Sequence, residues 1–121
     1  MTRTKVILVI EDEPSILALL CDLLEGEGYQ VHTATDGQSG LGRLAEAAPD
    51  LVLCDVMMPG MDGRAVCSAI YNNRSYRSIP IILMSAVAES SLGLDSAQYS
   101  AFMPKPINLD ALLGLIERLT P

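Results

Sequence analysis

Charged and polar side chains stand where several short apolar runs of this 121-residue chain come to an end. The candidates for chemistry are Glu11, Asp12, Glu13, Asp55, Ser85 and Lys105. If their carboxylates lie within a few ångströms, each raises the pKa of the others unless a cation compensates. Mg²⁺ suits carboxylate oxygens, whereas the sequence has no set of His and Cys residues with the spacing of a zinc site. The acidic residues therefore predict a site for Mg²⁺.

A carboxylate beside a metal ion, a lysine and a hydroxyl group is suited to phosphoryl transfer. The oxygens of a transferring phosphoryl group need charge stabilisation, which Lys105 and Mg²⁺ can provide. The Ser85 hydroxyl can donate a hydrogen bond to one of these oxygens. An aspartate can itself act as the nucleophile and form an acyl phosphate. Asp55 stands alone after its apolar run, and we predict that it is the acceptor.

Short apolar runs alternate with segments of helical periodicity along the chain. The predicted strands are residues 5–10, 29–34, 51–54, 79–84 and 101–103. The predicted helices are residues 14–24, 36–48, 64–71 and 89–98, with a last helix capped by Asn108. The helix over 89–98 has weak support, because Gly93 and several serines lower its helix propensity. Such alternation is typical of an α/β fold whose parallel sheet is covered on both faces.

The topology rules for parallel sheets reduce this alternation to few folds. Right-handed crossovers favour a flavodoxin-like, doubly wound (βα)5 fold with a five-stranded parallel sheet of order 2-1-3-4-5. Ligands bind such a sheet outside the carboxyl ends of its strands, at the switch point between the first and third strands. Asp12 and Asp55 follow these two strands. The predicted fold therefore brings the candidate residues into one crevice.

Composition limits the classes of partner and compartment. The chain carries 15 acidic and 8 basic residues, a net charge of −7, which argues against direct binding of nucleic acid. Its length suffices for one domain, which we expect to span residues 1–121. No apolar run approaches a membrane span and no signal peptide opens the sequence. Three cysteines without C-x-x-C spacing predict buried reduced thiols, so we expect a cytoplasmic protein without a membrane partner.

Several motifs resemble the receiver domain of two-component response regulators. They are VIEDEP at 9–14, LVLCDVMMPGMDG at 51–63, Ser85-Ala86 and Lys105-Pro106. Their order and spacing agree with that family over nearly the whole chain, and DVMMPGMDG at 55–63 is the most specific of them. The resemblance implies that Asp55 is phosphorylated by a histidine kinase or a histidine phosphotransfer protein. It also implies that Glu11, Asp12, Asp55 and the carbonyl of Met57 hold Mg²⁺, with Glu11 acting directly or through water.

The resemblance further implies a switch that responds to phosphorylation. Lys105, followed by a cis peptide, would bridge to the phosphoryl group, and Ser85 would turn toward it. Phe102 would change rotamer with Ser85 and alter an output face made of segment 89–98, strand 101–103 and the last helix. That face would contact a downstream effector protein or an attached output domain, and homodimerisation through it stays open. The domain would be regulatory rather than an enzyme.

Some positions depart from the usual pattern of the family. Glu11 stands where aspartate is commoner, and the interval from Ser85 to Lys105 is shorter than usual. The short interval predicts a shortened or irregular helix in segment 89–98. Met57 and Val87 are apolar where a polar side chain could orient water. We therefore expect slow loss of the phosphoryl group.

Alternative interpretations remain at this point. Leu19 and Ile16 on the first helix form either an apolar docking patch for a kinase helix or part of the core. The whole chain could be a pseudo-receiver, which binds partners without phosphorylation. A flavin protein is disfavoured, because the acidic loop 11–14 would repel a flavin phosphate. A metal-dependent phosphatase is disfavoured as well, because no second acid follows Asp55 closely enough to serve as general acid-base.

Overall fold

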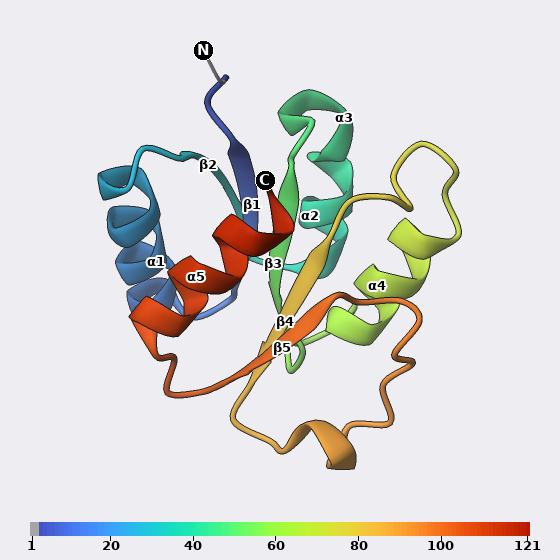
Figure 1. Ribbon diagram of the computed structural model, residues 1–121. Coiled ribbons are helices and arrows are strands. Elements are labelled where there is room, and N and C mark those ends of the chain that lie inside the picture. The colour runs from blue at the N-terminus through green and yellow to red at the C-terminus, as the bar shows by residue number, and fades with distance from the viewer. Residues whose placement is uncertain (1–2) are drawn as a thin grey trace.

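The strands form one parallel sheet in the order β2-β1-β3-β4-β5 (Figure 1). The structure is a computed structural model and describes residues 3–121. The strands are β1 (Val6–Ile10), β2 (Gln30–Ala34), β3 (Leu51–Asp55), β4 (Ile81–Ser85) and β5 (Ala101–Pro104). The register places Cys54 opposite both Ile10 and Leu83, so the carboxyl ends of the central strands lie side by side. The predicted fold class and strand order are confirmed.

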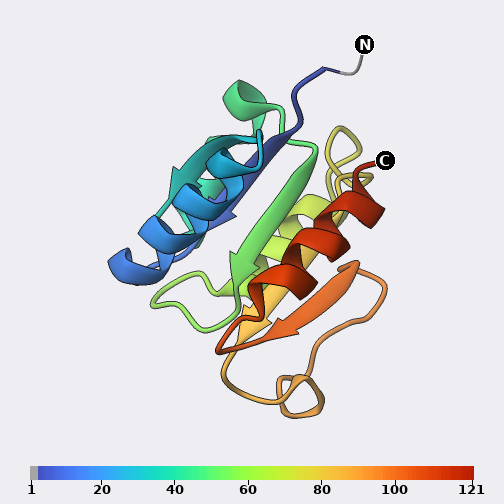
Figure 2. The same cartoon turned by 60° about the vertical axis from the view of Figure 1, so that its left-hand side comes forward.

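Helices cover both faces of this sheet (Figures 1 and 2). They are α1 (Pro14–Gly26), α2 (Gly37–Gly42), α3 (Leu44–Ala47), α4 (Gly63–Tyr71) and α5 (Leu109–Leu119). Successive side chains of a strand point to opposite faces. Ile7 and Val9 accordingly join the buried cluster under α1 and α5, whereas Leu8 and Ile10 join the cluster under α3 and α4. The sheet is therefore buried between two apolar layers, and its carboxyl edge is left for the site.

Capping side chains in the loops between strands and helices determine where three of the helices begin. The Asp36 carboxylate accepts a hydrogen bond from the Ser39 amide at 2.7 Å, and α2 begins there. Asp62 accepts from the amides of Arg64 and Ala65 at the start of α4. Asn108 accepts from the Ala111 amide at 2.9 Å and caps α5, as predicted. These caps satisfy amides that have no partner within the helix.

The predicted helix over 36–48 is wrong in one respect, because the structure divides it into α2 and α3 at Arg43. Gly40 and Gly42 weaken a continuous helix. Gly40 is also required by packing, since a Cβ there would lie 2.4 Å from Cδ1 of Ile10. The close approach of α2 to β1 therefore explains a glycine that disfavours helix.

The predicted helix over 89–98 is also wrong. The chain between β4 and β5 contains a single 3₁₀ turn, Glu89–Ser91, and continues as turns and irregular backbone. Gly93 adopts a φ of +62°, a left-handed conformation that a helix interior does not accommodate. The shortened and irregular segment expected from the short interval before Lys105 is confirmed, and it lacks an α-helix altogether. The predicted output face thus loses its helix over 89–98.

The expectation for the cysteines is confirmed in part. All three cysteines are free, and Cys54 and Cys67 are buried in the core. Cys21 is half-buried on α1, so the prediction that all three are buried is wrong. Within residues 3–121, no helix has both the length and the apolar character needed to cross a membrane.

Candidate functional site

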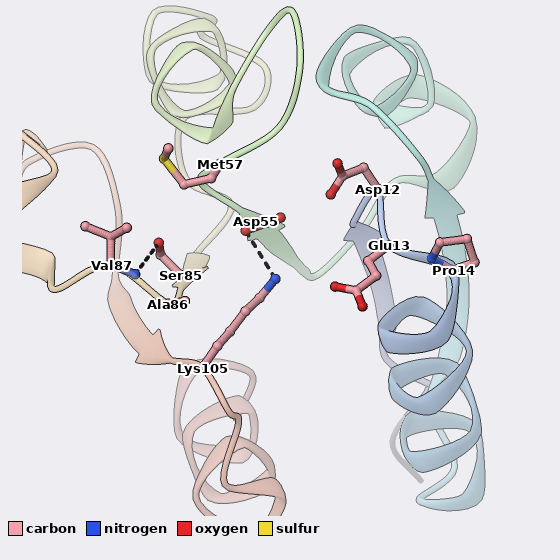
Figure 3. A pocket seen from close by; sticks show the side chains of 9 residues that line it. All are labelled: Asp12, Glu13, Pro14, Asp55, Met57, Ser85, Ala86, Val87 and Lys105. Carbon is pink, nitrogen blue, oxygen red and sulfur yellow. Dashed lines mark hydrogen bonds and ion pairs between the residues drawn. The ribbon is translucent and has the colours of Figure 1, made fainter.

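A pocket of about 700 Å³ opens at the carboxyl edge of the sheet (Figure 3). It is lined by Asp12, Glu13, Pro14, Asp55, Met57, Ser85, Ala86, Val87 and Lys105. These residues end or follow β1, β3, β4 and β5, which lie next to one another in the sheet. The parallel register therefore brings together positions that are far apart in the sequence, at the edge where the strand order predicted them.

Three carboxylates meet at this pocket: Asp12 and Asp55 line it, and Glu11 is buried beside them. Glu11, Asp12 and Asp55 each offer an oxygen atom that lies within 4.8 Å of the others. Glu11 is completely buried and Asp55 is 4% exposed, whereas Asp12 is exposed. Figure 3 shows the carboxylate of Asp12 directed toward Asp55 across the pocket. The structure therefore gathers the acidic residues that the sequence nominated as metal ligands.

Lys105 enters the pocket from the residue after β5 and pairs with two of these carboxylates. Its Nζ donates to Oε1 of Glu11 at 2.8 Å and lies 3.3 Å from Oδ1 of Asp55. Its backbone amide donates to the carbonyl of Ser85 at 2.8 Å, and its peptide bond to Pro106 is cis, as predicted. Burial opposes the charge of Lys105, but its contacts with Glu11 and Asp55 outweigh burial and raise its pKa.

Burial and a neighbouring carboxylate both act on the pKa of Asp55. Burial and the neighbouring Glu11 carboxylate raise the pKa of Asp55 to about 6, although Lys105 acts in the opposite direction. Among the described residues, Lys105 is the cation paired with this cluster of three carboxylates, and it contacts two of them, Glu11 and Asp55. Hard oxygen ligands with uncompensated charge suit a divalent cation such as Mg²⁺. The donor set therefore fits the metal that the sequence predicts.

The predicted switch residues lie in different surroundings. Ser85 is 1% exposed at the end of β4, and its Oγ accepts a hydrogen bond from the Val87 amide at 3.0 Å. Phe102 on β5 is half-buried and packs against the core cluster under α4. Its neighbour across the strand pair is Leu83, two residues before Ser85. The structure thus brings Ser85 to the pocket and leaves Phe102 outside its lining.

Exposed apolar side chains surround the mouth of the pocket. Met57 is 53% exposed and Val87 is 40% exposed, and Figure 3 shows both beside Ser85. Glu13 also lines the pocket, and its amide donates to Oε2 of Glu11 at 3.2 Å. The sequence indicated that Met57 and Val87 are apolar at positions where a polar side chain could orient water, and the structure places both in the lining of the pocket. The support that Glu13 gives to Glu11 through its backbone was missed, because a residue type carries no signal for a backbone contact.

A separate apolar groove of about 230 Å³ lies between α1 and the chain before α5. Its lining comprises Ile16, Leu19, Leu20, Lys105, Pro106, Ile107 and Leu109. Leu19 is 52% exposed, and Ile16 is half-buried. Of the two alternatives for this pair, the structure supports solvent exposure for Leu19. Lys105 lines both this groove and the acidic pocket, so the two sites adjoin.

A family model, related sequences and solved structures all point to the same family. The sequence model of the response regulator receiver domain matches residues 7–117. Response regulator PleD of Caulobacter vibrioides is 39% identical over 117 residues, which are 94% of this chain but 26% of PleD. The chain thus spans about a quarter of that relative. Protein PilG of Pseudomonas aeruginosa is 33% identical over 120 residues, which cover 95% of this chain and 87% of PilG.

A solved structure extends the agreement to the fold. The signal receiver domain of a signal transduction histidine kinase from Syntrophus aciditrophicus superposes with a TM-score of 0.87 at 31% identity. The match covers 97% of this chain and 90% of that one. The sequence motifs, the sheet order and the acidic pocket agree with these similarities. This chain belongs to the response regulator receiver domain family of two-component systems.

Proposed function

We propose that residues 1–121 act as one receiver domain and as the phosphoacceptor switch of a phosphorelay. The donor is a phosphohistidine of a histidine kinase or a histidine phosphotransfer protein. The bond between phosphorus and the imidazole nitrogen breaks, and a bond between phosphorus and an Oδ of Asp55 forms. The observation that carries the proposal is the convergence of three carboxylates and Lys105 around Asp55, at the end of the central strand β3.

Mg²⁺ is the proposed cofactor. Asp12, Asp55 and the carbonyl of Met57 would hold it, with Glu11 as a further ligand. Glu11 already accepts hydrogen bonds from Lys105 and from the Glu13 amide, which supports contact through water rather than direct contact. When bound, Mg²⁺ would neutralise charge on the phosphoryl oxygens. The excess negative charge of the pocket supports this assignment.

Lys105 and Ser85 have distinct proposed roles. Lys105 Nζ lies 3.3 Å from Asp55 Oδ1, so an oxygen of a phosphoryl group on Asp55 would come within its reach. Ser85 Oγ accepts from the Val87 amide, and the hydroxyl would turn to donate to the phosphoryl group. Phe102 would then adjust beside β4, as the family resemblance implies. An effector protein or an attached output domain would read the change, and a homodimer is a second arrangement that the same surface would serve.

The proposed domain is regulatory and loses its phosphoryl group slowly. Hydrolysis of an acyl phosphate needs a water molecule held in line with the bond that breaks. Met57 and Val87 project beside the pocket mouth and carry no polar side-chain group that would orient such a water. Their apolar character, at positions that line the pocket, supports a long-lived phosphorylated state.

Intact-mass measurement with acetyl phosphate tests the proposed function. With Mg²⁺ the wild-type chain should gain one phosphoryl group, and Asp55→Asn should gain none because it lacks the nucleophilic carboxylate. A chelator should abolish the gain, and removal of the donor should be followed by decay over minutes or longer. No mass gain together with no response to Mg²⁺ would instead favour a phosphorylation-independent interaction module.

A substitution at Leu19 tests the proposed partner surface. A glutamate at this exposed position would place a charge in the apolar groove between α1 and the start of α5. With a histidine kinase that phosphorylates the wild type, Leu19→Glu should slow phosphotransfer by about tenfold. Its phosphorylation by acetyl phosphate should stay unchanged, because the acidic pocket is intact. Tyr71→Glu on α4 is the matched control, and equal rates for both variants would reject the docking surface.

A further inference from the structure

The segment 86–100 between β4 and β5 keeps its shape through side-chain contacts rather than through a helix. Its 3₁₀ turn contributes hydrogen bonds from Ser91 to Ala88 and from Leu92 to Glu89. Gly93 then lies in a turn with a φ of +62°. Leu92 is 4% exposed and anchors the segment in the core. Figure 1 shows this segment, in orange, looping below and to the right of α4 before it enters β5.

Arg64 in the first turn of α4 holds this anchor. Its Nη1 donates to the carbonyl of Leu92 at 3.0 Å. Its Nη2 and Nε donate to Oδ2 of Asp62 at 2.8 and 3.2 Å. Asp62 uses its other oxygen, Oδ1, to cap α4. A planar guanidinium with several fixed donors is suited to such a three-way contact, whereas a lysine is not.

Asp62 ends the loop that begins after Asp55. The amide of the next residue, Gly63, donates to the carbonyl of Val56 at 2.9 Å and closes the loop on itself. A Cβ at Gly63 would lie 2.6 Å from the carbonyl oxygen of Asp55, so the loop end packs directly against the acceptor residue. A rearrangement around Asp55 and Met57 therefore reaches Asp62 through a short, tightly packed path.

Other contacts hold the distal part of the segment without touching this loop. One turn along α4, Ser68 Oγ donates to Oε1 of Gln98 at 2.9 Å. The Tyr99 hydroxyl donates to Oε2 of Glu89 at 2.5 Å and ties the segment to itself. Arg64 thus differs from Ser68 in joining the segment to the loop after Asp55. Ser68 provides a matched comparison from the same helix.

We propose that Arg64 is a positioning residue that couples the loop 56–62 to the segment 86–100, so that a ligand on Asp55 alters both together. The proposal rests on the proposed function and adds the residue that carries the response. Without an α-helix over 89–98, the segment has few backbone hydrogen bonds of its own to resist such a displacement. The predicted output of the domain is then a change in the exposed part of segment 86–100.

Hydrogen exchange measured by mass spectrometry tests whether the contact of Arg64 with Leu92 holds segment 86–100 in the unliganded protein. Arg64→Ala should raise exchange of the amides in segment 86–100 by about tenfold and leave the strands unchanged, since a charged hydrogen bond to Leu92 is lost. Arg77→Ala, which removes an exposed arginine in the loop after α4, is the control for charge. Arg64→Lys keeps the positive charge but lacks the planar guanidinium donors. Its exchange in segment 86–100 should lie between that of the wild type and that of Arg64→Ala. Equal exchange in Arg64→Ala and Arg77→Ala would overturn the proposal.

Mg²⁺ with beryllium fluoride, as a phosphoryl analogue, tests the coupling. In the wild type and in Ser68→Ala, it should change exchange both in loop 56–62 and in segment 86–100. In Arg64→Ala, the change in loop 56–62 should persist, as should any change at Ala86 and Val87, which lie in the pocket beside Ser85. The change in residues 89–100, which Arg64 reaches through Leu92, should be lost. A full response of the segment in Arg64→Ala would overturn the coupling and leave the phosphoacceptor function intact. No response of either region in the wild type would overturn the proposed function, and the coupling with it.

Discussion

Replacing Lys105 by methionine is expected to lower the free energy of unfolding by about 3 kcal/mol at pH 7 in metal-free buffer. Lys105 donates to Glu11 at 2.8 Å, and Glu11 has no exposed surface. Methionine fills a similar volume but leaves the Glu11 carboxylate buried without its cation. A charge left unpaired in this way costs several times more than the pair itself contributes. Chemical denaturation followed by Tyr fluorescence measures the loss.

The pH dependence distinguishes this electrostatic cause from loss of packing. The raised pKa of Lys105 means that its stabilising contribution is fully present at neutral pH and disappears only when the lysine deprotonates at high pH. In Lys105→Met, the penalty comes from negative charge left without its cation, and it should shrink as the pH falls toward the raised pKa of Asp55, about 6, where that carboxylate takes up a proton. Added Mg²⁺ should restore part of the loss. Lys5→Met, at the chain's other lysine, should change little, and an equal loss there would reject the explanation.

The sequence was sufficient for the sheet because its central strands are apolar on both faces. Every residue of β3 and β4 is buried, so the runs 51–54 and 79–84 show no alternation. Such runs occur in parallel sheets covered on both sides, and the crossover rules then leave one favoured strand order. The same order brings the residues after β1, β3, β4 and β5 to one edge. The positions of Asp12, Asp55, Ser85 and Lys105 followed from that geometry.

The sequence was insufficient where tertiary contacts replace local propensity. The low helix propensity of segment 89–98 indicated an irregular backbone, but the sequence did not indicate that Arg64, 28 residues before Leu92, donates to the Leu92 carbonyl. Nothing in the type of Arg64 signals a partner so far along the chain. Gly40 lowers the helix propensity of its segment, and the sequence did not indicate that its lack of a side chain is what lets α2 approach Ile10. Both cases concern packing between elements, which periodicity does not report.

Within the site, the residue types predicted the chemistry better than they predicted the hydrogen-bond partner of each side chain. The carboxylates and Lys105 were expected to share a crevice, and they do. The sequence left open whether Glu11 contacts the metal directly or through water, and the Glu11 carboxylate accepts hydrogen bonds from Lys105 and from the Glu13 amide. Ser85 was expected to serve the phosphoryl group, and in this structure its Oγ accepts from Val87. These orientations depend on side-chain rotamers and loop amides rather than on the order of residues.

Asp55→Asn is expected to stabilise the metal-free protein at pH 7 by about 1–2 kcal/mol, although it removes the proposed acceptor. Burial and Glu11 raise the pKa of Asp55 to about 6, above its value in an unfolded chain. Between these two pKa values the folded state binds the proton more tightly, so the stability of the wild type falls as the pH rises from about 4 to 6. The uncharged amide removes this cost. The gain stays below the full effect of the shift, because water reaches Asp55 through the open pocket.

The stability difference between Asp55→Asn and the wild type should depend on pH and on Mg²⁺ in a way that is specific to the acidic pocket. Thermal unfolding in a chelator should show a difference between Asp55→Asn and the wild type that is constant above pH 7 and vanishes near pH 4. Mg²⁺ should stabilise the wild type more than the variant, because binding to the folded state adds stability in proportion to affinity. Asp22→Asn, which removes one exposed charge from α1, should shift stability little at any pH. A variant less stable than the wild type at pH 7 without metal would show that Lys105 already balances the pocket, and the electrostatic argument for Mg²⁺ would then lose its basis.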